Sequence, residues 1–326
     1  MQETESQGTR DISSKYIERF EELQEVEKGI PYKEFYYHSR ARDRALEFRI
    51  LKKITETNEH AKLLVENCAM TCGMNRYADI LPYKDTLVKA PGHSYINASF
   101  VDASVSDKMF IATQGPMKGT MDAFWSMIWE YDVKLIIMMC SIQEEGMKKC
   151  EQYFPLDGTI TCENFEITLF RSVNKYDTLI EKILCVTENS TQQSKYVSHL
   201  QSTAWPDQST PSIQAEFHSI NYIISSIKKR IAGNPHSKIA VHCSAGIGRT
   251  GVLVGIYSMV TSLEDQIKKE LSGEEVQPCV SVFGTVRKMR EQRWGMVACL
   301  KQYKFLYKYM EYWITSFLTH LQHETF

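Results

Sequence analysis

The stretch VHCSAGIGRTG at residues 241–251 places a cysteine, Cys243, six positions before an arginine, Arg249. The residues before it, KIAV, are typical of a buried strand, and the residues RTGVLVGIYSMV after it are typical of a helix. A short loop that leads into a helix points several backbone N–H groups at one place, where the helix dipole adds partial positive charge. The pattern therefore predicts an anion-binding loop formed by Ser244, Ala245, Gly246, Ile247 and Gly248.

The same loop is expected to make Cys243 a nucleophile. An electric field that holds an anion also favours a thiolate, so the pKa of the Cys243 thiol should lie well below the free value of about 8.5. Arg249 carries a planar fork of donors that can meet two phosphate oxygens at once. His242 and Thr250 are predicted to tune the thiolate, Thr250 by donating a hydrogen bond to the sulfur. This combination predicts attack by a cysteine on a phosphate ester.

A cysteine that attacks a phosphate monoester needs a partner acid, because an alkoxide or phenoxide leaves poorly without a proton. The candidate is Asp207 in the segment TAWPDQSTP. Trp205 and Pro206 predict a stiff hinge with a large apolar anchor, and the polar residues up to Pro211 predict a mobile loop. Closure of this loop would bring the carboxylic acid to the leaving oxygen.

The composition of the chain is that of a globular protein and excludes several classes of partner and site. The chain has 326 residues, of which 43% are hydrophobic and 24% charged, so it can bury a large core. Its net charge of -2 gives no overall field that would favour nucleic acid or anionic lipid. The nine cysteines include no C-x-x-C pair and are expected to be reduced thiols. No G-x-x-x-x-G-K-[ST] loop and no cluster of ligands with zinc spacing is present, so neither a P-loop nor a zinc site is expected.

The N-terminus lacks the pattern of a secretory signal, and the longest apolar run, LIIMMC at 135–140, is too short to span a bilayer. We therefore expect a cytoplasmic, monomeric protein without nucleic-acid partners or stable membrane insertion.

Periodicity predicts the elements that must hold the loop. Strand-like runs cover 95–101, 109–113, 134–140, 165–173, 179–187 and 196–202. Apolar spacings of three and four predict helices over 14–28, 41–66, 120–132, 213–231, 251–263, 283–293 and 301–318. Residues 272–281 predict a polar surface loop with a helix-stopping Pro278.

No internal repeat or low-complexity linker divides the chain. We expect one α/β or α+β domain built around a mixed sheet flanked by helices. The predicted boundaries are a flexible N-terminal segment at 1–14, a catalytic domain at 15–317 and a short C-terminal tail at 318–326.

With these motifs in place, the chain resembles the classical, tyrosine-specific protein tyrosine phosphatases of the non-receptor kind. The resemblance covers about residues 15 to 315 and rests on motifs in the expected order. Besides the cysteine loop and WPD, they are NRYADILPY, YINASF, FIATQGP, FWSMIWE, LIIMMCSIQEEGMKKCEQYFP and QYKFLY. It implies the cysteine-dependent phosphatase fold, phosphotyrosyl proteins as substrates and no cofactor.

The resemblance also implies roles, residue by residue. Cys243 is the nucleophile, Arg249 the phosphate clamp, and Asp207 the acid of the first step and the base of the second. Glu144 orients the arginine, and Lys149 meets the acid loop when it closes. The implied substrate contacts are a wall formed by Tyr77 and a hold on substrate backbone amides by Asp79.

The chain departs from the family pattern at Ala298 and Cys299 in GMVACLKQY, where the family usually has Gln followed by Thr or Ser. That glutamine helps to position the water that hydrolyses the phosphocysteine, which alanine cannot do. Gln302 matches the family's second glutamine and can substitute in part. The expected result is a phosphoenzyme that forms readily and breaks down slowly.

Arg290 and Arg293 near the pocket are expected either to favour acidic residues beside the phosphotyrosine or to belong to a solvated helix face.

Two other functions remain open. A phosphotyrosine-binding module that captures its ligand with little turnover is favoured by Ala298 and disfavoured by the presence of Cys243 and Asp207. A phosphatase for phosphoserine, phosphothreonine or phosphoinositides would need a shallower or more basic pocket. Tyr77 and a loop without lysine argue against this second alternative.

Overall fold

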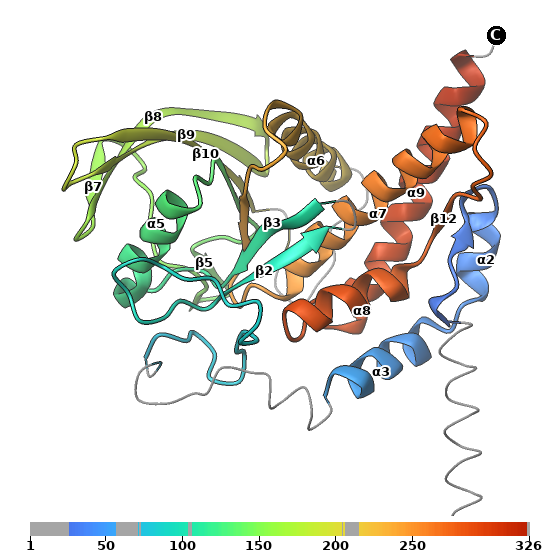
Figure 1. Ribbon diagram of the computed structural model, residues 1–326, viewed down its shortest axis with the longest axis horizontal. Helices are drawn as coiled ribbons and strands as arrows, with labels where there is room; N and C mark the ends of the chain where they lie inside the picture. Colours follow the sequence, from blue (N-terminus) through green and yellow to red (C-terminus); the bar gives the residue numbers. More distant parts are fainter. Residues whose placement is uncertain are drawn as a thin grey trace, which may run out of the picture.

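A mixed sheet of eight strands runs through the molecule and carries helices on both faces (Figure 1). The computed structural model describes residues 26–56, 71, 73–103, 106–203, 205 and 215–324. In spatial order the strands are β2 (Ala98–Ala103), β3 (Ser106–Thr113), β11 (Ile239–His242), β4 (Leu135–Met138), β10 (Ser194–Ser202), β9 (Leu179–Glu188), β8 (Phe165–Tyr176) and β7 (Thr159–Thr161). The chain forms a single α/β domain around this sheet, as predicted.

The centre of the sheet is parallel and the rest is antiparallel. β11 pairs in parallel with β3 on one side and with β4 on the other, and β4 pairs in parallel with β10. Every residue of β4 and of β11 is buried, which is the pattern of strands covered on both faces. Because β11 ends at His242, the cysteine loop emerges at the carboxyl end of the central strand.

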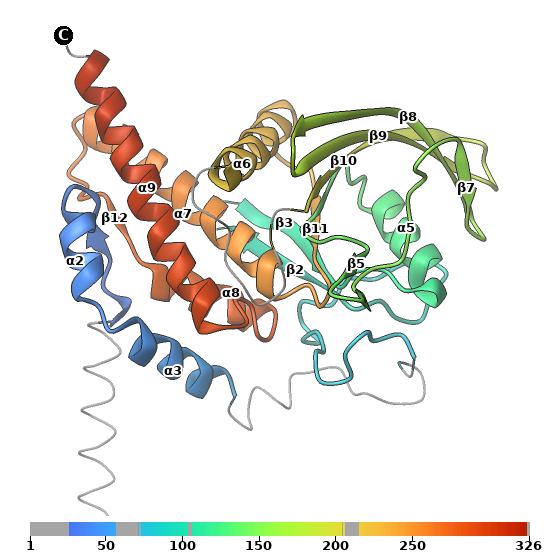
Figure 2. The ribbon, with the colours of Figure 1, turned by 180° about the vertical axis from the view of Figure 1, so that it is seen from behind.

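The described α-helices are α2 (Phe35–Ala41), α3 (Arg44–Thr55), α5 (Met121–Glu130), α6 (Ala215–Gly233), α7 (Gly248–Leu271), α8 (Val282–Gln292) and α9 (Leu300–Glu324). Of these, α7 and α8 pack against β2, and α7 also packs against β11. α7 packs against both α8 and α9, and α2 and α3 lie along α9 (Figure 2). α5 lies at the other end of the sheet, where Trp129 contacts Phe165 of β8.

Smaller elements complete the fold. They are β1 (Ile30–Pro31), β5 (Gln143–Glu144), β6 (Met147–Lys148), β12 (Cys279–Val280) and the 3₁₀ turns η1 (Tyr32–Glu34) and η2 (Lys118–Thr120). β1 pairs with β12, and β5 pairs with β6 as a hairpin.

The structure differs from the sequence-based expectations at several boundaries. The run at 95–101 becomes a strand only from Ala98. The loop at 272–281 contains β12, a two-residue strand that is too short to give a periodic signal. α3 begins after Asp43, whose side chain accepts hydrogen bonds from the amides of Ala45 and Leu46, as an N-cap does.

The ends of the chain were harder to assign. α9 continues to Glu324, so the segment expected as a tail from 318 begins as part of a helix. The helix predicted at 14–28 lies mostly outside the described residues, as does the end of the one predicted at 41–66. The N-terminal segment 1–14 lies wholly outside them.

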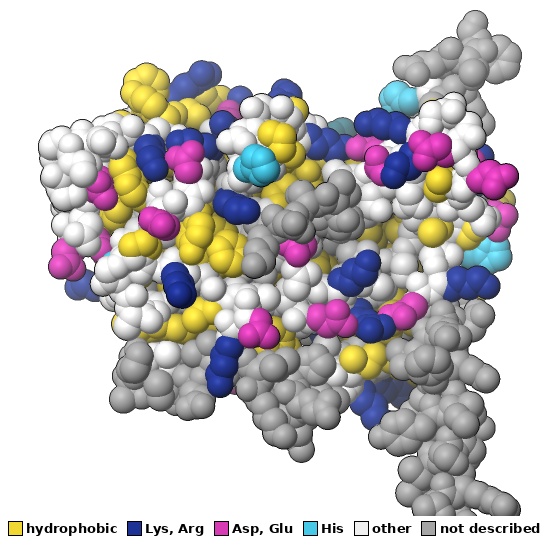
Figure 3. Space-filling model, in the orientation of Figure 1, with side chains coloured by type: hydrophobic (Ala, Val, Ile, Leu, Met, Phe, Trp, Pro, Cys, Tyr) yellow, Lys and Arg dark blue, Asp and Glu magenta, His cyan; other side chains and the backbone are white. Residues whose placement is uncertain are grey.

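The surface carries both signs of charge. On the face shown in Figure 3, Lys and Arg side chains are interspersed with Asp and Glu, in keeping with a net charge near zero. Among the described helices, none has the length and apolar character needed to cross a membrane.

Candidate active site

The loop between β11 and α7 has a backbone conformation that only glycine tolerates at one position. Gly246 has φ +71°, and a Cβ atom there would lie 2.0 Å from the carbonyl oxygen of Thr113. Within the described residues, the amides of Ser244, Ala245, Gly246 and Ile247 donate to no backbone carbonyl. A group of amides that donate to no backbone carbonyl, placed ahead of a helix N-terminus, is the arrangement that binds an anion.

Arg293 holds this loop from behind. Its guanidinium donates to the carbonyls of Gly246 (2.9 Å) and Ala245 (3.2 Å), and to the side chains of Asn97 and Ser99. Since a trans peptide points its N–H opposite to its carbonyl, the amides of Gly246 and Ile247 point away from Arg293. The Gly246 amide acts on the Cys243 sulfur. Arg293 was not expected to have this position.

The structure corrects the expectation for Arg290 and Arg293. Both are buried, with 3% and 1% of their surface exposed, so neither lies on a solvated helix face or at the pocket rim. Arg290 donates to the carbonyls of Met296 and Val297 and to the hydroxyl of Thr55. The N–H donors of both guanidinium groups bind groups inside the protein. Arg290 and Arg293 therefore do not face acidic residues of a substrate.

Cys243 is buried at the base of the loop. Burial alone would raise the pKa of its thiol, but the Arg249 guanidinium, the Thr250 hydroxyl and amide, and the Gly246 amide hold that pKa below its ordinary value. Thr250 is fully buried, and its hydroxyl has no partner of normal hydrogen-bond geometry among the described residues. Its hydroxyl and amide nevertheless lie close enough to the sulfur to lower the pKa of the Cys243 thiol.

Arg249 at the start of α7 is held by a bidentate ion pair. Its Nη1 and Nη2 donate to the two carboxylate oxygens of Glu144, at 2.6 and 3.0 Å. Nη1 also donates to the carbonyl of Trp205 at 2.7 Å. Although burial opposes the charge, Glu144 and the neighbouring cysteines keep the pKa of Arg249 above its ordinary value, so the guanidinium stays charged.

The contact with Trp205 joins the clamp to the segment that leads to Asp207. Trp205 is buried, and its ring packs against Phe305 of α9 with ring centroids 5.0 Å apart. Asp207 and the residues up to 214 lie outside the described part of the chain, so the position of the predicted acid remains a prediction.

His242 does not face the sulfur. Its ring is buried, with Nδ1 3.0 Å from the carbonyl oxygen of Cys243 and Nε2 2.7 Å from the hydroxyl of Tyr153. Burial lowers the pKa of His242 to about 4, so the ring is neutral near pH 7. His242 thus acts on the backbone of the loop, and Tyr153 is a contributor that sequence reasoning missed.

Tyr77 lies at the rim of the loop. Its hydroxyl is 2.9 Å from the Ser244 hydroxyl, and 37% of its surface is exposed, which leaves the ring accessible to a ligand. Asp79 is exposed two residues further along, and Lys149 is buried after the β5–β6 hairpin. The structure therefore places Tyr77 against the predicted anion-binding loop.

Gln302 lies beside the loop at the start of α9. It is buried, its Oε1 accepts a hydrogen bond from the Ala298 amide at 3.0 Å, and its carboxamide packs on Gly248. Ala298 itself is exposed, and the preceding Val297 amide donates to the Ile247 carbonyl at 2.9 Å. A side chain at position 298 would therefore project from a segment that is tied directly to the anion-binding loop.

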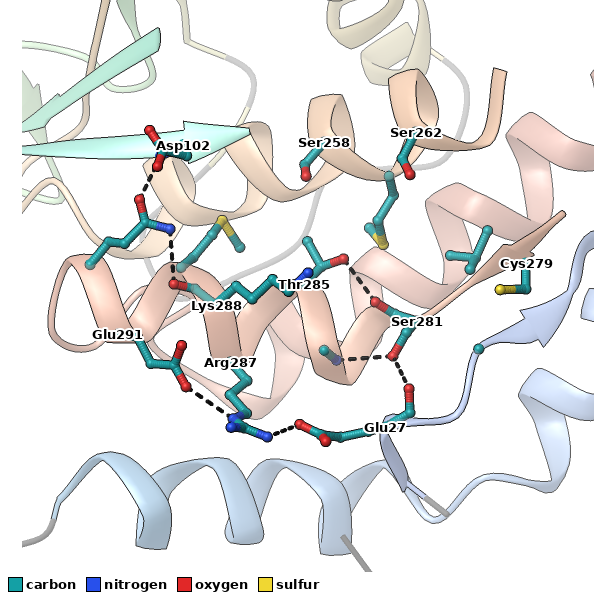
Figure 4. Close-up of a pocket in the computed structure, with 16 residues that line it drawn as sticks. Glu27, Asp102, Ser258, Ser262, Cys279, Ser281, Thr285, Arg287, Lys288 and Glu291 are labelled. Atoms are coloured by element: carbon teal, nitrogen blue, oxygen red, sulfur yellow. Dashed lines mark hydrogen bonds and ion pairs between the residues drawn. The ribbon is translucent and has the colours of Figure 1, made fainter. Parts of the chain in front are cut away.

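A separate cavity lies away from the predicted catalytic residues. A pocket of about 710 Å³ lies between α7, α8 and β12. Arg287 on its lining contacts Glu27 and Glu291 (Figure 4). None of the predicted catalytic residues lines it. No group of His, Cys, Asp and Glu in the described residues has the arrangement of a metal site.

Comparison with known proteins shows that the sequence is similar to protein tyrosine phosphatases. The sequence model of the family described as protein-tyrosine phosphatase matches residues 72–312. Human tyrosine-protein phosphatase non-receptor type 18 is 36% identical over 246 residues, and human receptor-type tyrosine-protein phosphatase alpha is 31% identical over 277. These alignments cover 72% and 83% of the chain, but only 49% and 32% of the two relatives. The chain thus spans half or less of the length of these relatives.

Solved structures show the same likeness. The crystal structure of the catalytic domain of human protein tyrosine phosphatase non-receptor type 18 superposes with a TM-score of 0.74 at 30% identity. The superposition covers 86% of this chain and 99% of that domain. A structure of PTPN18 in complex with HER2 phosphopeptides gives a TM-score of 0.73 at 30% identity and covers 82% of this chain and 92% of that one.

Proposed function

Because the chain belongs to the protein-tyrosine phosphatase family, we propose that it hydrolyses phosphotyrosine in proteins through a phosphocysteine on Cys243. In the first step the thiolate attacks phosphorus and Asp207 gives its proton to the leaving phenol oxygen. In the second step Asp207 takes a proton from a water that attacks the same phosphorus and releases the sulfur. The observation that carries the proposal is a buried thiol beneath loop amides that donate to no backbone carbonyl. The Arg249 guanidinium beside it helps to hold the pKa of this thiol below its ordinary value.

The loop amides, Arg249, Glu144 and Tyr77 are proposed to bind the phosphoryl group and the ring of the substrate. The phosphoryl group carries negative charge on its equatorial oxygens, which the loop amides and the Arg249 fork can meet. Glu144 holds the fork in one plane through two hydrogen bonds, and Tyr77 offers an accessible ring for stacking on the substrate ring. The depth that Tyr77 gives the pocket favours phosphotyrosine over the shorter phosphoserine.

The proposed substrates are phosphotyrosyl proteins, which the complexes of PTPN18 with HER2 phosphopeptides support by analogy. A peptide pair of one sequence, with phosphotyrosine in one and phosphothreonine in the other, tests the selectivity. We expect phosphate release from the first only, and equal release from both would contradict the proposal. The cytoplasmic location and the monomeric state stay predictions.

Arg249→Lys is expected to lower kcat/KM by roughly 10²-fold or more, because a point charge cannot replace a fork with two fixed donors. Steady-state kinetics on a phosphotyrosyl peptide would show a lower kcat and a higher KM. Arg171→Lys, at an exposed position on β8, is the matched control and should behave as the wild type. Wild-type kinetics for Arg249→Lys would contradict the clamp assignment.

The second step is proposed to be slow, because alanine replaces the water-positioning glutamine at position 298. The wild-type protein should then give a burst of phenol in a pre-steady-state trace with an aryl phosphate. Ala298→Gln is expected to shrink the burst and to raise steady-state turnover by about tenfold, less than the roughly 10²- to 10⁴-fold of a positioned acid or base, because Asp207 remains as the base. Ala298→Leu, of similar size but without an amide, should give no gain.

A linear trace with high turnover in the wild-type protein would contradict the slow step. The alternative function, capture of phosphotyrosyl ligands with little turnover, is favoured by the same residue, Ala298. Tight peptide binding together with turnover no higher than that of Cys243→Ser would support the alternative.

A further inference from the structure

We propose that His199 is a positioning residue for the nucleophile, which acts through Tyr153 and His242 on the carbonyl of Cys243. His199 lies on β10 and is fully buried. Its Nε2 is 2.8 Å from the Tyr153 hydroxyl oxygen, which is in turn 2.7 Å from Nε2 of His242. Three side chains from separate parts of the sequence thus form one continuous chain of hydrogen bonds that ends on the loop.

The Cys243 carbonyl fixes the direction of each hydrogen bond that links His242, Tyr153 and His199. The Cys243 carbonyl can only accept, so Nδ1 of His242 carries a proton and donates to it. A neutral His242 then has an unprotonated Nε2, which must accept from the Tyr153 hydroxyl. With its one proton used, the tyrosine oxygen must accept from His199, so Nε2 of His199 carries the proton.

Two further observations agree with this direction. Nδ1 of His199 is buried and makes no hydrogen bond to another residue in the described part of the chain, which is tolerable for a nitrogen without a proton. Lys182 of β9 lies directly opposite His199 in the antiparallel pair and is itself buried. Burial together with this neighbouring cation keeps the pKa of His199 well below its ordinary value, so His199 is neutral.

The proposed role of His199 is to donate a hydrogen bond to the Tyr153 oxygen, so that the Tyr153 hydroxyl donates its own proton to Nε2 of His242. A residue that only accepted at position 199 would compete for that proton, and His242 would then turn its own Nε2–H toward the tyrosine oxygen. Its bare Nδ1 would face the Cys243 carbonyl, and two acceptors would repel each other. The hydrogen bond to this carbonyl also polarises the peptide that carries the Ser244 amide, one of the donors of the loop.

Nuclear magnetic resonance tests the direction of these hydrogen bonds without an activity measurement. Long-range ¹H–¹⁵N spectra of protein labelled at histidine distinguish the two tautomers. We expect Nδ1–H for His242 and Nε2–H for His199 near pH 7, with assignments from His242→Gln and His199→Gln. The opposite tautomer at either residue would overturn the proposal.

Two nearly isosteric variants test the consequence. His199→Gln keeps a donor, whereas His199→Glu is an acceptor, kept ionised by Lys182 opposite. We expect alkylation of Cys243 near pH 7, located by peptide mapping, to slow about tenfold in the Glu variant and to stay within about threefold of wild type in the Gln variant. Thermal melts of both variants establish that they fold.

Tyr153→Phe separates action through the tyrosine from a general effect of the new charge. In a double-mutant cycle, the difference between Glu and Gln at position 199 should disappear in the Phe background. A difference that persists there, or equal behaviour of Glu and Gln in the parent, would overturn the proposal. The kinetic meaning of the effect rests on the proposed function, but tautomers and alkylation do not, so the two can fail separately.

Discussion

The Cys243→Ser protein is expected to release no measurable phosphate from a phosphotyrosyl peptide while it still binds the peptide. A serine hydroxyl stays protonated at neutral pH even beside Arg249, so the nucleophile is lost. Loss of a covalent nucleophile lowers turnover by on the order of 10⁴-fold or more. The loop amides and the Arg249–Glu144 pair do not depend on the sulfur, so the binding site should persist.

The measurement is phosphate release under saturating peptide, together with peptide affinity by calorimetry. Cys185→Ser is the matched control, because Cys185 is a partly exposed free cysteine on β9, outside the cysteine loop. We expect it to keep wild-type turnover. Turnover by Cys243→Ser at more than a small fraction of wild type would mean that another group attacks the phosphate.

Asp207→Ala is expected to lower kcat by roughly 10²- to 10⁴-fold, the range for loss of a general acid. The loss should depend on the leaving group, because a phenol of low pKa leaves without a proton. We therefore expect a large loss with a phosphotyrosyl peptide and a much smaller one with an activated aryl phosphate such as a nitrophenyl ester. Substrate affinity should change little.

Asp157→Ala removes an exposed carboxylate outside the site and serves as control. An Asp207→Ala loss of equal size on both substrates would point to a structural role for Asp207. Unchanged turnover on the peptide would assign the acid to a different residue.

The loop itself could be predicted from sequence because its determinants are local. A buried strand, glycines and a helix start follow one another between residues 239 and 251, and the structure has β11, the loop and α7 there. The ion pair between Arg249 and Glu144, which are 105 residues apart, had no local signal and was expected only from the family resemblance.

The residues that support the loop from behind could not be predicted in the same way. Arg293 and Arg290 lie in a polar helical pattern, and an arginine in such a pattern normally faces solvent. Their burial depends on carbonyls that the fold brings to them, among them those of Gly246 and Val297. Tyr153 and His199 likewise belong to apolar segments in which a hydroxyl or an imidazole gives no periodic signal.

The most direct test of the mechanism is rapid-quench labelling with a ³²P-phosphotyrosyl peptide, followed by peptide mapping of the acid-stopped protein. We expect radioactive phosphate on the peptide that contains Cys243, appearing before free phosphate and absent from Cys243→Ser. Release of phosphate without any label on Cys243, or label on another residue, would contradict a phosphocysteine intermediate at this position.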